Sequence, residues 1–491
     1  MTEQNDVDVV IIGAGFAGLS AADRIKQLNQ VRAARGQGAL SYVILEGSMR
    51  AGGRAFTQPG HLDVGGQYLA PEHIDPKVGD TPQWAAWSLV NRFGIQMFPT
   101  HLPKDVPNVY LAGDQTRLEF SGNYPNEGDP QVTKLVEQIE ALVTSVKPFI
   151  QHPWDHPDAQ VLDALSVQDW IAANIGEPAV GELMAVAVRS AFSVEPKDCS
   201  VLHFLHYAAS CGSFAAFENV NGGGDAIRFR FGTYDLIQRL VGEVGPDNVL
   251  FGRRAKLIEQ NASSCRVTAQ VGEQSVETWT AQRVIVAMAP SASAALTFSP
   301  PLPAARTALT DGMPMASTIK GFAIFKTPWW RERFSGYCLS AHGPLDWVMD
   351  NTWLDENGQL GEASLMTFIV AEQAVIFGNG QSTPVDRREA VLDQLEVLFD
   401  AKDKVRPQLV RYVDWDWSAD EWGRGCPAGC IRPRILTKLV NGQRVGAALY
   451  APFQRVHWAG SEAGLKWMGG YMNGAIDSGV RAAEAVAALI T

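Results

Sequence analysis

The glycines near the start of the chain have a spacing that could bind phosphate groups. Gly13, Gly15 and Gly18 follow the pattern Gly-x-Gly-x-x-Gly, with Phe16 and Ala17 between the last two. In this pattern Gly13 allows a tight turn, Gly15 lets the backbone approach a pyrophosphate, and Gly18 lets a helix pack closely on a strand. Glycine spacing alone is a weak signal, so the segments on either side of it decide its meaning.

Those flanking segments predict the strand and helix that would position the glycines. Residues 9–12 are an unbroken apolar run of β-branched residues, typical of a parallel strand buried on both faces. The chain from Leu19 onward favours a helix whose N-terminus would point at the phosphates. Glu46 ends a second apolar stretch and would bind ribose hydroxyls, although it comes later than usual. We interpret residues 30–38 as an insertion that causes the delay, and we predict a dinucleotide site.

Two more glycine pairs follow. Gly52 and Gly53 precede Arg54, which would put a flexible backbone and a fixed cation beside the pyrophosphate. The alternative is a surface turn with a solvated arginine. Gly65 and Gly66 would again allow close approach to a flat ligand.

Lys320 is an unusual residue for its surroundings. It lies in the strongly apolar segment 313–325, which predicts a strand. Lysine is rarely buried without a partner, so this strand either lies at a sheet edge with Lys320 facing water, or brings Lys320 to a functional site. The residues alone leave both interpretations open.

Cysteine and histidine spacings raise the question of a metal or redox site. His203 and His206 are three positions apart, with Cys199 nearby, and Cys426 and Cys430 are four apart. No further ligand cluster accompanies either set, so we predict packed side chains and no metal site.

Length and composition are those of a soluble globular protein with more than one domain. The chain has 491 residues, of which 46% are hydrophobic and 19% charged. A net charge of −12 argues against nucleic acid as a partner. Six cysteines in this length do not indicate a disulfide framework. A polar N-terminus and the lack of an apolar run of ~18 residues predict neither a signal peptide nor a membrane span, so we expect a cytoplasmic protein.

Periodicity predicts several further elements. Apolar spacing favours helices over residues 132–146, 164–175 and 384–399. Ser166 and Asp169 resemble a capping box, with Asp in place of the usual Glu.

The order of these motifs resembles that of the flavin-dependent amine oxidases, the monoamine oxidase-like group. The resemblance rests on residues 12–18, 45–46, 52–54 and 63–66, and it continues through Lys320 to the C-terminal segment. It implies that the dinucleotide is FAD and that Lys320 is a catalytic residue bonded through a water to flavin N5.

The resemblance also implies a fold. We expect an α/β protein with a discontinuous Rossmann-like FAD-binding domain and an inserted α+β substrate domain. The FAD-binding domain would comprise residues 1–88, 217–300 and 415–491, and the substrate-binding domain residues 89–216 and 301–414.

Site residues follow from the same resemblance. The implied FAD-binding residues are Gly13, Gly15, Phe16, Ala17, Gly18, Glu46, Gly53, Arg54, Gly66, Gln67, Ala255, Trp417, Cys426, Gly460, Glu462, Gly470, Tyr471 and Met472. The implied substrate-facing residues are Tyr68, Phe192, Trp467 and Tyr471.

Cys426 aligns with the cysteine that carries FAD through an 8α-thioether in some family members. Pro427 stands where the family often has one of two aromatic cage residues, and Tyr471 matches the other. The resemblance therefore allows covalent FAD at Cys426, and a buried free thiol is the alternative.

The implied reaction is hydride transfer from the carbon beside a neutral amine nitrogen to FAD. The resulting imine would be hydrolysed to an aldehyde or ketone plus ammonia or an amine, and O₂ would reoxidise the flavin to give H₂O₂. An L-amino acid oxidase is less expected, because residues 66–70 lack the arginine that clamps a carboxylate in those enzymes. An amine dehydrogenase with a protein acceptor and a flavin-binding interaction scaffold remain alternatives. The implied partners are a small amine and O₂, without nucleic acid or membrane, and a homodimer is left open.

Overall fold

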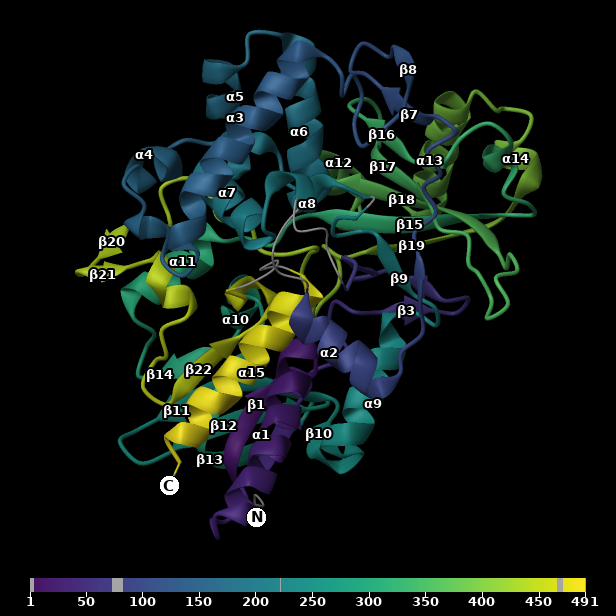
Figure 1. The fold of residues 1–491 in the computed structure, drawn as a ribbon. Helices are drawn as coiled ribbons and strands as arrows, with labels where there is room; N and C mark the ends of the chain where they lie inside the picture. Colours follow the sequence, from purple (N-terminus) through teal and green to yellow (C-terminus); the bar gives the residue numbers. More distant parts are fainter. Residues whose placement is uncertain (1–3, 73–82, 221, 466–470, 491) are drawn as a thin grey trace.

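The computed structural model describes residues 4–72, 83–220, 222–465 and 471–490. Figure 1 shows two sheet-containing halves, with one sheet in the lower half and a second sheet and a group of helices in the upper half. The first long helix and the last helix of the chain lie side by side in the lower half.

The lower sheet has eight strands. Their order is β10-β2-β1-β13-β12-β11-β14, and β22 also pairs with β13. The bounds are β1 Gln4–Ile12, β2 Tyr42–Leu45, β10 Val249–Leu250, β11 Arg253–Gln260, β12 Cys265–Val271, β13 Ser275–Ala287, β14 Thr297–Ser299 and β22 Val456–Ala459.

Strand β1 lies at the centre of this sheet. It pairs in parallel with β2 and with β13, so that Ile11 lies opposite Ile44 and Ile285. Successive residues of β1 face opposite cores: Ile11 packs with α1, whereas Val10 packs with residues of β11 and β12. Both faces are covered, which explains the unbroken apolar run in the sequence.

Helices cover one face of the sheet. They are α1 Phe16–Ala34, α2 Trp84–Phe93, α9 Thr233–Val244 and α15 Met472–Ala488. The core beneath them contains Leu19, Ile25 and Ile237, each fully buried.

The upper sheet has seven strands in the order β19-β15-β18-β17-β16-β7-β8. Their bounds are β7 Asn108–Leu111, β8 Arg117–Phe120, β15 Thr318–Phe325, β16 Cys338–Ser340, β17 Leu345–Asp350, β18 Ala363–Val370 and β19 Leu409–Asp416. Strand β15 is paired on both sides, with Lys320 opposite Phe368 of β18 and Trp415 of β19. The interpretation of Lys320 as an edge-strand residue facing water is therefore wrong.

The two faces of β15 have different environments. Ile319 and Ala323 face a core closed by helix α13 Pro384–Phe399, with α12 Ala371–Phe377 and α14 Val405–Gln408 nearby. Phe322 and Ile324 face the opposite way, into a core shared with Tyr68 and Trp417.

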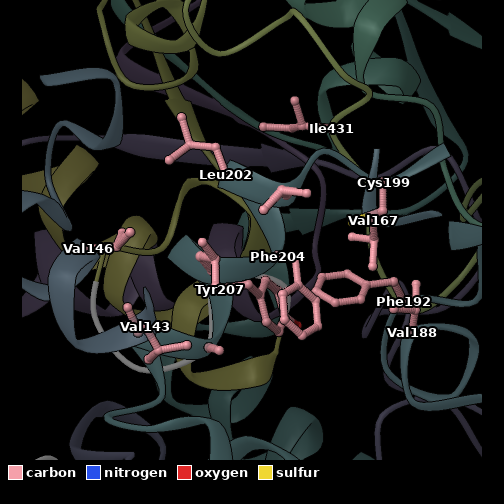
Figure 2. Close-up of a cluster of buried hydrophobic side chains, with 14 of the residues drawn as sticks. Val143, Val146, Val167, Val188, Phe192, Cys199, Leu202, Phe204, Tyr207 and Ile431 are labelled. Carbon is pink, nitrogen blue, oxygen red and sulfur yellow. The ribbon is translucent and has the colours of Figure 1, made fainter. Parts of the chain in front are cut away.

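A group of helices completes the upper half. They are α3 Pro130–Val146, α4 Ala159–Ala164, α5 Val167–Asn174, α6 Pro178–Phe192, α7 Val201–Ser210, α8 Phe214–Glu218 and α11 Ala304–Gly312. Figure 2 shows their shared core, in which Phe192, Phe204 and Tyr207 gather. The ring centroids of Phe192 and Tyr207 are 4.7 Å apart.

Further elements are short. They are α10 Pro290–Ser293 and the strands β3 Thr57–Gln58, β4 Leu62–Asp63, β5 Tyr68–Leu69, β6 Met97–Pro99, β9 Ile227–Phe229, β20 Leu439–Val440 and β21 Gln443–Arg444.

The α/β fold predicted from the sequence is confirmed, and two local predictions need correction. Residues 30–34, interpreted as part of an insertion, continue helix α1. The helix predicted over residues 164–175 is α5, which begins later, at Val167, because Ser166 caps it by accepting a hydrogen bond from the Asp169 backbone N–H. The capping box itself is present, with Asp169 accepting from the Ser166 N–H at 3.1 Å. The predicted domain boundaries stay a prediction.

Candidate active site

A cavity of about 300 Å³ lies between the two sheets and receives residues from both. At one end it is lined by the glycine turn after β1 and by Glu46, and at the other by Tyr68, Trp347 and Phe368. We call it the main cavity.

The glycine turn presents a helix N-terminus to the main cavity. Gly13, Gly15, Phe16 and Ala17 line it, and no side chain caps the first turn of α1. Its backbone N–H groups are therefore suited to a pyrophosphate. Gly18 does not line the cavity: a Cβ there would lie 1.9 Å from the Gly13 carbonyl oxygen, so glycine is needed where α1 crosses β1.

Glu46 follows β2 and lines the same end of the cavity. Its carboxylate accepts hydrogen bonds from the N–H groups of Ala14 at 2.7 Å and Ser48 at 2.8 Å. These two bonds fix the carboxylate and leave acceptor capacity for ribose hydroxyls.

Arg54 lines the cavity through a buried ion pair. Its guanidinium donates to Glu462 at 2.6 Å, to the Ser461 hydroxyl at 3.0 Å and to the Pro427 carbonyl at 2.9 Å. Burial opposes ionisation of Glu462, but the charge and hydrogen bond of Arg54 outweigh it and hold the pKa of Glu462 below its usual range. Glu462, which was predicted to bind the cofactor, does not line the main cavity but pairs with Arg54, which does.

Lys320 lies in the middle of the site and is only 3% exposed. Its ammonium donates to the Gly65 carbonyl at 3.0 Å and to Gln67 Oε1 at 2.8 Å. Gln67 is held in turn by Asn351, to which its amide donates at 2.5 Å. Burial lowers the pKa of Lys320 to about 8.

Cys426 and Cys430 lie in different environments. Cys426 lines the main cavity, and burial raises the pKa of its thiol to about 11 although the charges of Arg54 and Lys320 act in the opposite direction. Cys430 packs in the helical core with Cys199, so the two cysteines of the 426–430 segment do not form one site.

The far end of the main cavity is aromatic. Trp347 and Phe368 stack with ring centroids 4.9 Å apart, and Tyr68 lies 6.3 Å from Trp347. Tyr471, which precedes α15, also lines this wall. The arrangement suits an apolar substrate body held against a flat cofactor.

A second cavity of about 110 Å³ adjoins this end. Five residues line both cavities: Ser190, Ala191, Asp225, Trp347 and Tyr471.

The structure brings most of the predicted site residues together. The main cavity is lined by Gly13, Gly15, Phe16, Ala17, Glu46, Gly53, Arg54, Gly66, Gln67, Tyr68, Ala255, Lys320, Cys426, Gly460, Tyr471 and Met472. Trp467 and Gly470 lie outside the described residues.

Trp417 and Phe192 lie apart from the cavity wall. Trp417 is fully buried, and its indole N–H donates to the Val64 carbonyl at 2.7 Å, so it supports the Gly65–Gly66 segment from behind. Phe192 belongs to the helical core, where its ring contacts Tyr207 (Figure 2). Both side chains are large and apolar, and such a side chain can line a cavity or pack in a core. The sequence alone could not distinguish these two positions.

Several cavity residues were not identified from the sequence. Trp347 and Phe368 reach the site because β17, β18 and β15 are neighbours in the upper sheet. That pairing is not visible in one sequence. Asp225 follows a run of three glycines. Such a run indicates an irregular loop but does not indicate that the loop reaches a functional site.

Two negative findings apply to the described part of the chain. Within it, no group of three or more histidine, cysteine or carboxylate side chains is arranged to hold a metal ion. Within the same ranges, no helix combines the length and apolar character needed to cross a bilayer.

Comparisons with known proteins give relatives over the full length. The chain is 30% identical over 495 residues to Mycobacterium tuberculosis AofH, named as a flavin-containing monoamine oxidase, covering 99% of this chain and 97% of that protein. It is 28% identical over 518 residues to an L-amino acid dehydrogenase of Synechocystis, covering 100% and 97%. Among solved structures, cyclohexylamine oxidase from Brevibacterium oxydans superposes with a TM-score of 0.83 at 26% identity, covering 99% of each chain.

A family model agrees with these relatives. The family described as flavin containing amine oxidoreductase matches residues 16–487, nearly the whole chain. The match includes Arg54, Lys320 and the start of α15, all of which line the main cavity. The chain therefore belongs to the flavin-containing amine oxidoreductase family, enzymes that oxidise amines with a flavin.

Proposed function

We propose that this protein binds FAD along the main cavity and oxidises an uncharged amine at the aromatic end, with O₂ as the electron acceptor. The observation that carries the proposal is the position of Lys320. It is a buried cation on a strand that is paired on both sides, and it faces the same cavity as Glu46 and the uncapped N-terminus of α1. FAD would supply the acceptor for a hydride removed from the carbon beside the amine nitrogen.

The residues at the Glu46 end of the main cavity are suited to successive parts of FAD. The first turn of α1 would bind the pyrophosphate, Glu46 the ribose hydroxyls, and the backbone at Ala255 the adenine. Arg54, held by Glu462, would add a fixed positive charge near the centre. At the other end, the N-terminus of α15, which begins at Met472, would stabilise negative charge on the flavin ring.

The aromatic end would position the amine and exclude water. Tyr68, Trp347, Phe368 and Tyr471 form walls that hold an apolar body with its C–H bond toward the cofactor. Burial raises the pKa of Tyr68, so its phenol stays uncharged and does not act as a base. We assign Lys320 to holding a water and assisting the reaction with O₂.

Two rival activities differ in how the cavity bears on them, and an amino acid oxidase has less support than an amine oxidase. An amino acid oxidase needs a cation for the substrate carboxylate. Of the arginines lining the main cavity, Arg54 is paired with Glu462, while Arg253, Arg254 and Arg424 lie toward the Glu46 end with Trp422. A dehydrogenase would share this cavity and differ only in its electron acceptor.

We further propose a covalent thioether between Cys426 and FAD. Cys426 lines the main cavity together with Lys320 and Arg54, whose positive charges favour the thiolate needed for attachment. Burial acts against the thiolate, so attachment would depend on those two cations.

One experiment tests the activity against its rivals. The purified, yellow protein is given a panel of amines and L-amino acids, and peroxide production is compared with reduction of an artificial electron acceptor. Peroxide formed from amines at a rate similar to acceptor reduction supports the oxidase. Acceptor reduction without peroxide indicates a dehydrogenase, and turnover of L-amino acids alone overturns the choice of amines.

A further inference from the structure

Asp225 lies where the main cavity and the second cavity share a wall. It is one of the five residues that line both cavities, together with Ser190, Ala191, Trp347 and Tyr471. The other four are uncharged. A substrate that extends from the aromatic end of the main cavity toward the second cavity therefore passes this carboxylate.

The second cavity is otherwise a neutral environment. Its described lining is mainly aliphatic and aromatic, and Asp225 is the single charged residue among those side chains. A carboxylate in such surroundings lacks the solvation that water would give it, and this is costly unless a cation or a hydrogen-bond donor compensates.

No described residue supplies that compensation by direct contact. The backbone carbonyl of Asp225 accepts from the Thr100 hydroxyl at 2.6 Å, which fixes the loop. Within the described ranges, its carboxylate oxygens form neither a hydrogen bond nor an ion pair. Burial raises the pKa of Asp225 to about 6, and the charge of Lys320 acts in the opposite direction. At neutral pH the group is therefore mainly an anion that faces the cavities without a direct partner.

The chemistry of the reaction determines which cation this anion can bind. Hydride leaves the carbon beside a nitrogen that must be uncharged, since a protonated nitrogen has no lone pair to assist it. A carboxylate paired with the reacting nitrogen would stabilise the protonated, unreactive form. A useful partner for Asp225 is thus a different nitrogen, separated from the reacting one by the length of the substrate.

We propose that Asp225 binds a second, positively charged nitrogen of the substrate and so selects diamines and other amines with a distal cation. This rests on the proposed amine oxidation and adds its substrate class. In longer substrates, the apolar chain beyond the nitrogen that pairs with Asp225 would enter the second cavity. The same carboxylate would repel substrates that carry a carboxylate at this position.

The test compares α,ω-diamines with monoamines of equal chain length, in which a methyl group replaces the distal ammonium. We expect the FAD-loaded wild type to prefer the diamine at one chain length. Asp225→Asn should lower kcat/KM for that diamine by about 10- to 100-fold, mainly through KM, since a hydrogen bond to a charged group is lost. The monoamine should change by less than about threefold, and Asp225→Glu should retain the preference.

A control variant separates this effect from net charge. Asp311→Asn removes one negative charge from the exposed end of α11 and should leave the diamine preference unchanged. FAD content and thermal midpoint of each variant establish that it is folded.

Binding measured by calorimetry distinguishes failure of this proposal from failure of the proposed function. If the wild type oxidises no amine but binds the diamine more tightly than the monoamine, and Asp225→Asn removes that difference, the site stands and the activity is wrong. If the wild type binds and oxidises the monoamine as well as the diamine, Asp225 does not select a distal cation. Equal losses for both substrates in Asp225→Asn would also overturn the proposal, because they indicate a structural role.

Discussion

At the scale of single residues, Lys320 lies in an environment that is unusual for a lysine, since only 3% of it is exposed. It is a cation on a strand paired on both sides, hydrogen-bonded only to the Gly65 carbonyl and Gln67 Oε1 in the described chain. Lys320→Met should keep the fold and FAD but slow the reaction of the substrate-reduced enzyme with O₂ by roughly 100-fold, as for loss of a preorganised charge. Stopped-flow mixing of the reduced enzyme with O₂ measures this.

The pH dependence gives a second readout of the same residue. Since burial lowers the pKa of Lys320 to about 8, its charge is present below that pH and lost as pH rises through it. The rate at which the reduced wild-type enzyme reacts with O₂ should fall as the pH rises through this value. The corresponding rate of Lys320→Met should not change. Lys326→Met, an exposed lysine just after the same strand, is the control. Oxygen kinetics unchanged by Lys320→Met would remove Lys320 from the mechanism.

Cys426 allows a test of covalent attachment with a control in the same segment. We expect the acid-precipitated wild type to stay yellow and Cys426→Ala to release all its flavin. Cys430→Ala should behave as wild type, because Cys430 packs in the helical core and does not line the main cavity. Flavin that leaves the wild-type pellet completely would show that Cys426 is a free thiol.

At the scale of elements, the contact between α1 and β1 positions the phosphate-binding turn. A Cβ at Gly18 would lie 1.9 Å from the Gly13 carbonyl oxygen, so Gly18→Ala must push α1 away from the strand. We expect a loss of about 1–3 kcal/mol of stability, typical of overpacking, and weaker FAD retention. The thermal midpoint and the FAD content after gel filtration report both effects.

Gly38→Ala is the matched substitution, because a Cβ at Gly38 meets no atom within 4 Å. It should leave stability and FAD content nearly unchanged. Equal behaviour of the two variants would mean that α1 can shift without cost, contrary to the packing argument.

Elements with a strong local signal were predictable from the sequence. The strand before Gly13, the helix after it and helix α13 depend on apolar period and on glycine or capping residues close in the chain. The aromatic end was not predictable, because Phe368 and Trp347 reach Lys320 only through strand pairing between distant segments. Asp225 likewise depends on where a glycine loop folds back.

At the scale of the whole molecule, the main cavity joins the two sheets. Gly13, Glu46 and Ala255 reach it from the lower sheet or the segments that follow its strands, and Lys320 and Phe368 reach it from the upper sheet. A ligand that contacts all of them binds only when both halves are folded and docked. Its binding free energy therefore adds to the stability of the folded chain.

Removal of FAD should therefore destabilise the protein as a unit. A cofactor present at 100 times its dissociation constant contributes about 2.7 kcal/mol, so the thermal midpoint of FAD-free protein should fall by several degrees. The measurement uses Cys426→Ala, from which flavin can be removed without breaking a covalent bond, followed by scanning calorimetry before and after FAD is added back. Restoration of the midpoint in proportion to the logarithm of FAD concentration is expected, because the effect is one of mass action. A thermal midpoint that does not change when FAD is added would mean that the cofactor does not bind in the cavity between the two sheets.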